Sequence, residues 1–204
     1  MNPENPSTAY SHEIGAMDMD YLPKMRHNYV SYGKLLVLGN PRYGKFRIVI
    51  GPHWYVSIIG FSLLTLIGVG ILMPLWPVLS LVLRIIYILV FSFTLFMYII
   101  IFLSNPGIIP QKPNSEVAED VEAKTKYSCT KCLSLRAQKA YHCEDCDVCI
   151  EEWDHHCVWV GKCIGRQNLL VFYVFVATIP IFFVFVMFMT CVMSFDLHKH
   201  SHVN

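Results

Sequence analysis

The chain has 204 residues, of which 54% are hydrophobic and 14% aromatic, and its formal net charge is +1 at pH 7. Soluble domains average about 45–50% apolar residues, so this composition favours a lipid environment. The near-zero charge gives no support for a nucleic-acid-binding function, and we expect no nucleic-acid partner.

Two segments precede the first apolar stretch. Residues 1–28 carry scattered prolines, serines and acids, and they are predicted to be a disordered cytosolic N-terminus. Residues 29–53 are predicted to be a cytosolic segment that precedes the membrane, because several lysines and arginines lie in and around it.

Three apolar stretches, at about 54–72, 78–103 and 169–195, are each long enough to cross a hydrocarbon core, which needs about 20 helical residues. The first two are separated by a short turn with two prolines, which are expected to end the first helix. Residues 54–103 are therefore predicted to form a transmembrane helical hairpin. The fold class predicted is mainly α and integral to the membrane, with three transmembrane helices.

The distribution of basic residues predicts the orientation. Lysines and arginines lie before the first span and between the second and third spans, whereas the hairpin turn has none. By the positive-inside rule, both of those segments are cytosolic. The cytosol is reducing, so cysteines there favour metal ligation or a reactive thiol over disulfides.

Between the second and third spans, residues 104–126 are predicted to be a turn, with Asn105-Pro106-Gly107, followed by an acidic linker. Residues 127–168 form a cysteine-rich segment, and residues 196–204 follow the third span as a short tail. Two Cys-x2-Cys pairs lie in the cysteine-rich segment, and such pairs let two thiolates from one tight turn bind one zinc ion.

The number of possible ligands in this segment exceeds what two closed zinc sites need. Without Cys157 it offers six cysteines and three histidines, and two tetrahedral sites use eight of these nine groups. Cys157 and one histidine are then left over, with Asp154 nearby. These are the parts of a nucleophile, its base and an orienting carboxylate. The alternative is that all of them fold a zinc module that makes protein contacts.

The pattern strongly resembles the DHHC cysteine-rich domain of the protein S-acyltransferases, or palmitoyltransferases. The resemblance covers residues 50–195, including the flanking spans. The matching residues within the domain are Cys129, Cys132, His142, Cys143, Cys146, Cys149, Asp154, His155, His156, Cys157, Trp159, Cys163, Ile164, Gly165, Asn168 and Phe172.

The resemblance implies two structural zinc ions and a catalytic group. One zinc would take Cys129, Cys132, His142 and Cys149, and the other would take Cys143, Cys146, His156 and Cys163. Cys157 would be the nucleophile, with His155 as its base and Asp154 polarising that histidine. The enzyme would be a protein-cysteine S-palmitoyltransferase with ping-pong kinetics, acting on fatty acyl-CoA and on substrate proteins with membrane-proximal cysteines.

Further residues are candidates for contact with acyl-CoA. Trp159 and Phe172 would line the acyl channel near the reactive end, and ordinary core packing is the alternative for both. Lys162 and Arg166, with Arg136 and Lys139, would contact the CoA phosphates. A basic collar facing membrane lipid is the alternative for these four.

Some features depart from the family pattern. One span follows the cysteine-rich segment in this sequence, where relatives usually have two, and we expect the protein to lack the fourth helix and the Thr-Thr-x-Glu motif. Val158 stands where proline is usual, and Lys162 where asparagine is common. A non-catalytic zinc-binding membrane adaptor, or a truncated inactive relative, is the competing function. The expected location is an endomembrane (ER or Golgi) or the plasma membrane, with the zinc domain cytosolic.

Overall fold

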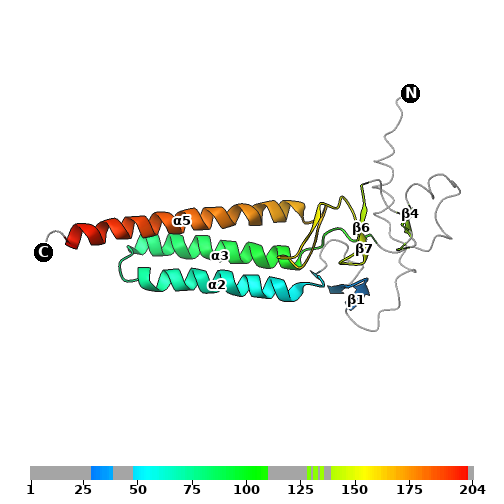
Figure 1. Ribbon diagram of the computed structural model, residues 1–204, viewed down its shortest axis with the longest axis horizontal. Helices are drawn as coiled ribbons and strands as arrows, with labels where there is room; N and C mark the ends of the chain where they lie inside the picture. The colour runs from blue at the N-terminus through cyan, green and yellow to red at the C-terminus, as the bar shows by residue number, and fades with distance from the viewer. Residues whose placement is uncertain are drawn as a thin grey trace, which may run out of the picture.

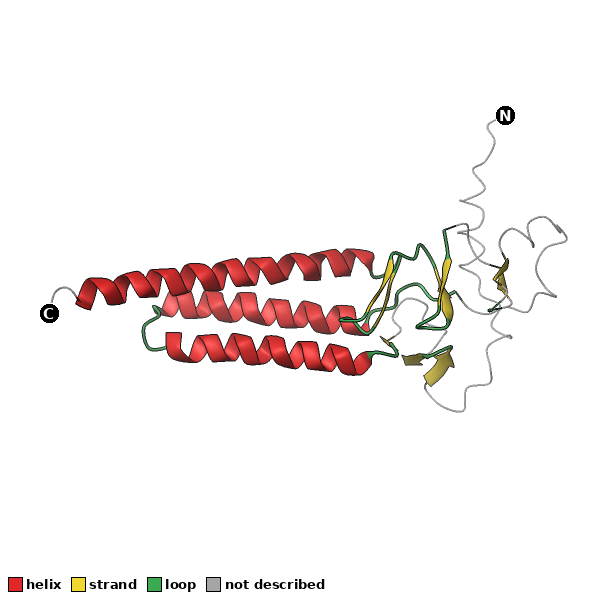
Figure 2. Ribbon diagram, in the orientation of Figure 1, coloured by secondary structure: helices red, strands yellow, loops and turns green. Residues whose placement is uncertain are grey.

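The computed structural model describes residues 29–38, 48–109, 128–129, 131–132, 134–135 and 139–201. Long helices form one end of the molecule, and short strands gather at the other end (Figures 1 and 2). The predicted segments 1–28 and most of 104–126, together with Arg136, lie outside the described residues. The helices are α2 (Trp54–Leu75), α3 (Leu81–Leu103) and α5 (Leu169–Ser201).

All three helices are long and apolar enough to cross a membrane, which confirms the predicted fold class of three spans with a cysteine-rich domain between the second and third. Their ends differ from the prediction. Helix α2 runs through Pro74 to Leu75, because a proline so close to the end of a helix disturbs few of its hydrogen bonds. Helix α3 begins at Leu81 rather than near residue 78, because the side chain of Ser80 caps it by accepting from the N–H of Leu83 at 3.5 Å. Helix α5 continues to Ser201, beyond the predicted end at 195.

Helix α3 lies between α2 and α5 (Figure 1). Near the middle of the bundle, Tyr87 and Phe182 are fully buried and their ring centroids lie 5.8 Å apart. The Tyr87 hydroxyl donates to the carbonyl of Gly68 at 2.7 Å, so this polar group is satisfied within the apolar layer. This hydrogen bond joins α3 to α2, and the contact between the Tyr87 and Phe182 rings joins α3 to α5.

A small antiparallel sheet precedes the first span, in residues for which the sequence predicted only a cytosolic segment before the membrane. It consists of β1 (Tyr29–Tyr32), β2 (Leu35–Leu38) and β3 (Ile48–Ile50), in that order. The buried face of this sheet packs against the cysteine-rich hairpins, with Leu35, Val37 and Val49 in one apolar cluster with Cys143, Cys146, Val148, Ile150 and Cys163. The segment before the membrane is therefore part of the cysteine-rich domain's core.

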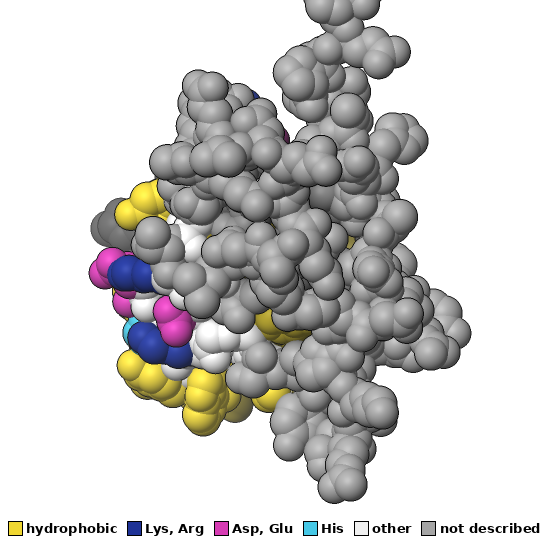
Figure 3. All heavy atoms as spheres, turned by 90° about the vertical axis from the view of Figure 1, so that its right-hand side faces the viewer, with side chains coloured by type: hydrophobic (Ala, Val, Ile, Leu, Met, Phe, Trp, Pro, Cys, Tyr) yellow, Lys and Arg dark blue, Asp and Glu magenta, His cyan; other side chains and the backbone are white. Residues whose placement is uncertain are grey.

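The cysteine-rich segment folds into three two-stranded antiparallel units within the described residues. They are β4 (Ser128–Cys129) with β5 (Ser134–Leu135), β6 (Tyr141–Cys143) with β7 (Val148–Ile150), and β8 (His155–Cys157) with β9 (Lys162–Ile164). Figure 3 looks onto this end of the molecule and shows basic and acidic side chains next to one another at its edge. Two ion pairs lie in this domain, Lys131 with Glu144 and Arg166 with Glu151, each at 2.6 Å.

Candidate active site and metal sites

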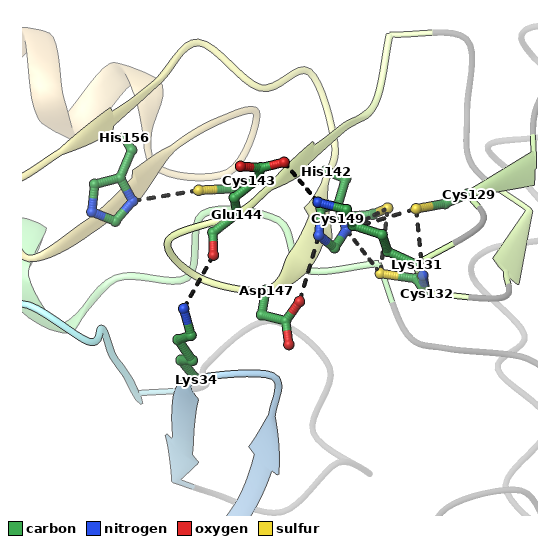
Figure 4. A network of polar contacts seen from close by, with 10 residues as sticks. All are labelled: Lys34, Cys129, Lys131, Cys132, His142, Cys143, Glu144, Asp147, Cys149 and His156. Carbon is green, nitrogen blue, oxygen red and sulfur yellow. Dashed lines mark hydrogen bonds and ion pairs between the residues drawn. The ribbon is translucent and has the colours of Figure 1, made fainter.

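The first cysteine and histidine cluster brings together Cys129, Cys132, His142 and Cys149, all of them buried, with their ligand atoms within 4.8 Å of one another. The Nδ1 atom of His142 lies 3.2 Å from the Cys132 sulfur and 3.7 Å from that of Cys129 (Figure 4). Strand pairing explains part of the arrangement, because His142 of β6 lies opposite Cys149 of β7.

The second cluster brings together Cys143, Cys146, His156 and Cys163, again with ligand atoms within 4.8 Å of one another. The Nδ1 atom of His156 lies 3.5, 3.4 and 3.7 Å from the sulfurs of the three cysteines in that order. Hydrogen bonds from the thiols of Cys146 and Cys163 lower the pKa of Cys143, so this cluster readily holds a thiolate, which is the form that binds metal.

The geometry of both clusters fits zinc. A tetrahedral ion with Zn–S bonds of about 2.3 Å places its sulfurs about 3.8 Å apart. The sulfurs of Cys132 and Cys149 are 3.7 Å apart in the first cluster, and those of Cys146 and Cys163 are 3.6 Å apart in the second. Three cysteines and one histidine complete four-coordinate sites with no position left for water, which is the pattern of structural zinc. The two clusters are therefore compatible with two zinc ions.

The β6–β7 hairpin contributes to both clusters at once. Because successive side chains of a strand point to opposite faces, His142 turns toward the first cluster and Cys143 toward the second. The outer nitrogen of His142, Nε2, lies 3.5 Å from the carboxylate of Asp147 (Figure 4). The same figure shows Lys34, from the β1–β2 hairpin, donating to the carbonyl of Glu144 at 3.2 Å. The sheet before the first span is thus tied to the turn between β6 and β7.

The alternation along β8 separates metal ligation from the reactive group. His156 lies opposite Cys163 of β9, and both belong to the second cluster. His155 and Cys157 flank His156 and therefore lie on the other face of the strand. The Nδ1 atom of His155 lies 3.2 Å from the Asp154 carboxylate, and its ring contacts Phe172 of α5 with centroids 5.1 Å apart.

The half-buried thiol of Cys157 packs against an apolar cluster at the junction of the strands and helices. Burial raises the pKa of Cys157, while hydrogen bonds from the main-chain N–H groups of Val160 and Trp159 oppose that rise. Burial thus favours the protonated thiol over the thiolate, and a nucleophilic role requires a neighbouring base.

Of the residues predicted to contact acyl-CoA, Phe172 is half-buried beside His155, and Trp159 is exposed. Arg166 is half-exposed and pairs with Glu151. Lys162 differs from the expectation, because its side chain is fully buried and its ammonium donates to the carbonyls of Val49 and Phe102. It is not placed to contact a phosphate at the surface.

The position of Lys162 has a clear physical role. Phe102 belongs to the last turn of α3, where carbonyls lack partners within the helix and where a cation is favoured by the helix dipole. Burial nevertheless lowers the pKa of Lys162 to about 7. Lys162 therefore joins β9 to β3 and to the end of α3. No sequence pattern distinguishes such a lysine from an exposed one.

We expect Lys162→Ala to lower the free energy of unfolding by about 2–5 kcal/mol, because two buried carbonyls lose a donor and the side-chain stem leaves a cavity. Thermal unfolding in detergent measures the change. Arg166→Ala is the matched control, since a surface ion pair contributes about 0–1 kcal/mol. Equal stability of the two variants would contradict the role given to Lys162.

Two residues that sequence reasoning missed also contact the β8–β9 hairpin, which carries Cys157 and is called the reactive hairpin below. The hydroxyl of Tyr98 in α3 lies 3.0 Å from the carbonyl of Ser57 and 2.9 Å from that of Trp159, so its hydrogen is shared between α2 and the turn after Cys157. The Nδ1 atom of His53, just before α2, lies 2.9 Å from Nε2 of His156. Neither residue lies in a motif, and a tyrosine in an apolar span reads as ordinary packing.

An apolar pocket of about 290 Å³ lies between α2 and α3. Tyr98 belongs to its lining and contacts the turn after Cys157, so the pocket adjoins the reactive hairpin. Its lining residues are Ser57, Ile58, Phe61, Tyr98, Ile99, Phe102 and Leu103.

Comparison with known proteins agrees with this arrangement. Residues 122–204 match the family model described as DHHC palmitoyltransferase. The chain is 32% identical over 108 residues to palmitoyltransferase ZDHHC5-B of Danio rerio, covering 46% of this chain and 16% of that protein. It is 39% identical over 77 residues to palmitoyltransferase ZDHHC9 of Pongo abelii (38% of this chain, 21% of that protein). It is 41% identical over 75 residues to palmitoyltransferase erf2 of Emericella nidulans (37% of this chain, 12% of that protein).

Proposed function

We propose that the chain is a protein S-acyltransferase of the DHHC type, because residues 122–204 match the DHHC palmitoyltransferase family model. It would transfer a palmitoyl group from acyl-CoA to a cysteine of a substrate protein, through an acyl-enzyme on Cys157. The matched stretch covers 16% of the first of these relatives and 21% of the second, so the activity is inferred from the site rather than carried over from them.

The observation that carries the proposal is the division of β8 into two faces. His156 faces the second metal cluster, whereas His155 and Cys157 flank it on the opposite face, and Asp154 contacts His155. A cysteine outside both ligand sets, beside a histidine also outside them, supports a nucleophile with its base. When bound, the two zinc ions would supply fold stability only, since each site has its four protein ligands.

The proposed reaction has two half-reactions. His155 takes the thiol proton of Cys157, and Asp154 fixes the tautomer of that histidine and stabilises its protonated form. The thiolate attacks the thioester carbonyl of acyl-CoA, the bond from that carbon to the CoA sulfur breaks, and the CoA thiolate receives the proton. A substrate cysteine thiolate then attacks the acyl-enzyme and displaces Cys157. Ping-pong kinetics follow from this order.

The location of Cys157 suits an acyl donor. Its side chain packs against an apolar cluster shared by the cysteine-rich domain, α3 and α5, where Phe175 and Met97 are buried. An acyl chain gains about 0.8 kcal/mol for each CH₂ removed from water. We propose that the acyl chain lies along the helices near Trp159 and Phe172. The pocket between α2 and α3 is one candidate site for part of it.

The polar part of CoA would meet exposed cations of the same domain. Arg166 and Lys139 are exposed and remain candidates for its phosphates, whereas Lys162 does not. We propose that this domain faces the cytosol, as the lysine and arginine distribution predicts, where it would act on protein cysteines close to the membrane.

The test is labelling of the purified full chain in detergent with a clickable palmitoyl-CoA analogue, beside a Cys157→Ser variant. We expect label on the parent that survives denaturation and is removed by neutral hydroxylamine, and no such label on the variant, because serine cannot form a thioester. Absence of label on a parent that holds two zinc ions would overturn the proposal and favour a zinc-binding membrane adaptor or an inactive relative.

A further inference from the structure

His53 contacts a predicted zinc ligand from outside the cysteine-rich segment. Its Nδ1 atom lies 2.9 Å from Nε2 of His156, and the two rings meet edge to face, with centroids 5.1 Å apart and planes at 81°. His53 is the residue immediately before α2, so the contact joins the start of a membrane-spanning helix to the second metal cluster.

The chemistry of His156 fixes the direction of this hydrogen bond. Nδ1 of His156 faces three cysteine sulfurs at 3.4–3.7 Å, so it is the nitrogen that would bind metal. A neutral imidazole that binds metal through one nitrogen carries its hydrogen on the other. Nε2 of His156 therefore donates, and Nδ1 of His53 accepts, so His53 carries its own hydrogen on Nε2.

The histidine of the first cluster has the same orientation. His142 also turns Nδ1 toward the sulfurs, and the carboxylate of Asp147 lies 3.5 Å from its Nε2, at ion-pair distance but without a hydrogen bond. Outer partners of this kind orient metal-binding histidines, and carboxylates are common among them. In the second cluster the imidazole of His53, from another part of the chain, lies at hydrogen-bond distance from the outer nitrogen of the ligating histidine.

The main chain holds His53 in place for this contact. Its N–H donates to the carbonyl of Gly161 at 3.2 Å, and its carbonyl accepts from the N–H of Val56 at 3.0 Å. Gly161 has a φ of +79°, and a Cβ atom there would approach the His53 carbonyl oxygen to 2.9 Å and the Ser57 hydroxyl to 2.8 Å. The close approach of the two segments therefore requires glycine at position 161.

We infer that His53 is a positioning residue for the reactive cysteine, acting through His156. By accepting from Nε2, it sets the ring orientation of His156, and β8 carries His156 and Cys157 together. Its effect on acylation rests on the proposed function, whereas its effect on metal retention does not. The contact also gives a physical link between the start of α2 and the hairpin that holds the thiol.

The test is the rate of zinc release from the full chain in detergent to the chromogenic chelator 4-(2-pyridylazo)resorcinol. In His53→Ala we expect one of the two zinc ions to be released about 10–100-fold faster, the usual cost of losing such a partner, and the other at the parent rate. His53→Asn places an amide oxygen where Nδ1 stood and should restore slow release. His53→Gln places its oxygen near the position of Nε2 and should not.

Ile59→Ala is the matched control, because Ile59 is exposed on the same helix and is expected to leave both release rates unchanged. Release from His53→Ala at the parent rate would overturn the inference, as would equally fast release from the alanine and asparagine variants. A parent without zinc would overturn it together with the metal sites. A parent that holds two zinc ions but forms no acyl-enzyme would overturn the proposed function and with it the effect of His53 on acylation, whereas the effect on zinc release would stand.

Discussion

Cys146→Ser is expected to cost the protein a zinc ion and the fold around it. Cys146 is fully buried, and its sulfur lies 3.4 Å from Nδ1 of His156 and 3.6 Å from the sulfur of Cys163. Structural zinc contributes about 10–16 kcal/mol of apparent binding free energy in small zinc modules, which is comparable to the whole stability of a domain. The apolar cluster that joins β1–β3 to the cysteine-rich hairpins includes Cys146. The sheet and the hairpins should therefore both become sensitive to protease.

Zinc content measured by mass spectrometry, together with limited proteolysis in detergent, checks this expectation. We expect two zinc ions in the parent and at most one in the variant, with faster cleavage of the strand-bearing end. Cys191→Ser is the control, because Cys191 is exposed on α5 and belongs to neither cluster. A Cys146→Ser protein with two zinc ions and the protease resistance of the parent would show that the second cluster is not a metal site.

The parts of the structure that sequence reasoning predicts well depend on local patterns. Apolar runs predicted the three membrane-spanning helices, and only their ends differ, where single residues such as Ser80 decide. Cysteine spacing is also a local signal, since Cys143 and Cys146 lie at the turn between β6 and β7, which the N–H of Asp147 closes by donating to the carbonyl of Cys143 at 2.8 Å. The eight side chains that the family resemblance assigned to zinc are the same eight that the structure gathers into two clusters.

The residues that sequence reasoning missed act across long stretches of chain. His53 and His156 are 103 positions apart, and Lys162 reaches the carbonyl of Val49, 113 positions away. Such contacts arise because β3 and the start of α2 pack onto the reactive hairpin, a tertiary pairing without a local signature. The charge of Lys162 predicted exposure, but the free carbonyl at the end of α3 makes burial possible.

His155→Ala is expected to slow formation of the acyl-enzyme by about 10²–10⁴-fold, the usual contribution of a general base. The reason is the raised pKa of the half-buried Cys157 thiol, which disfavours the thiolate unless a base takes the proton. Labelling with the palmitoyl-CoA analogue under single-turnover conditions measures the rate. Asp154→Asn should have a smaller effect in the same direction, because Asp154 is half-exposed and acts through His155.

The neighbouring residue provides the matched control. His156→Ala should lose zinc from the second cluster and with it the local fold, whereas His155→Ala should keep two zinc ions and the thermal stability of the parent. The two histidines are adjacent, yet the alternation of side chains along β8 directs one to the metal and the other toward Phe172 of α5. If His155→Ala formed the acyl-enzyme at the parent rate, the Cys157 proton would have to leave by another route. If it lost zinc, the proposed separation of the two faces of β8 would be wrong.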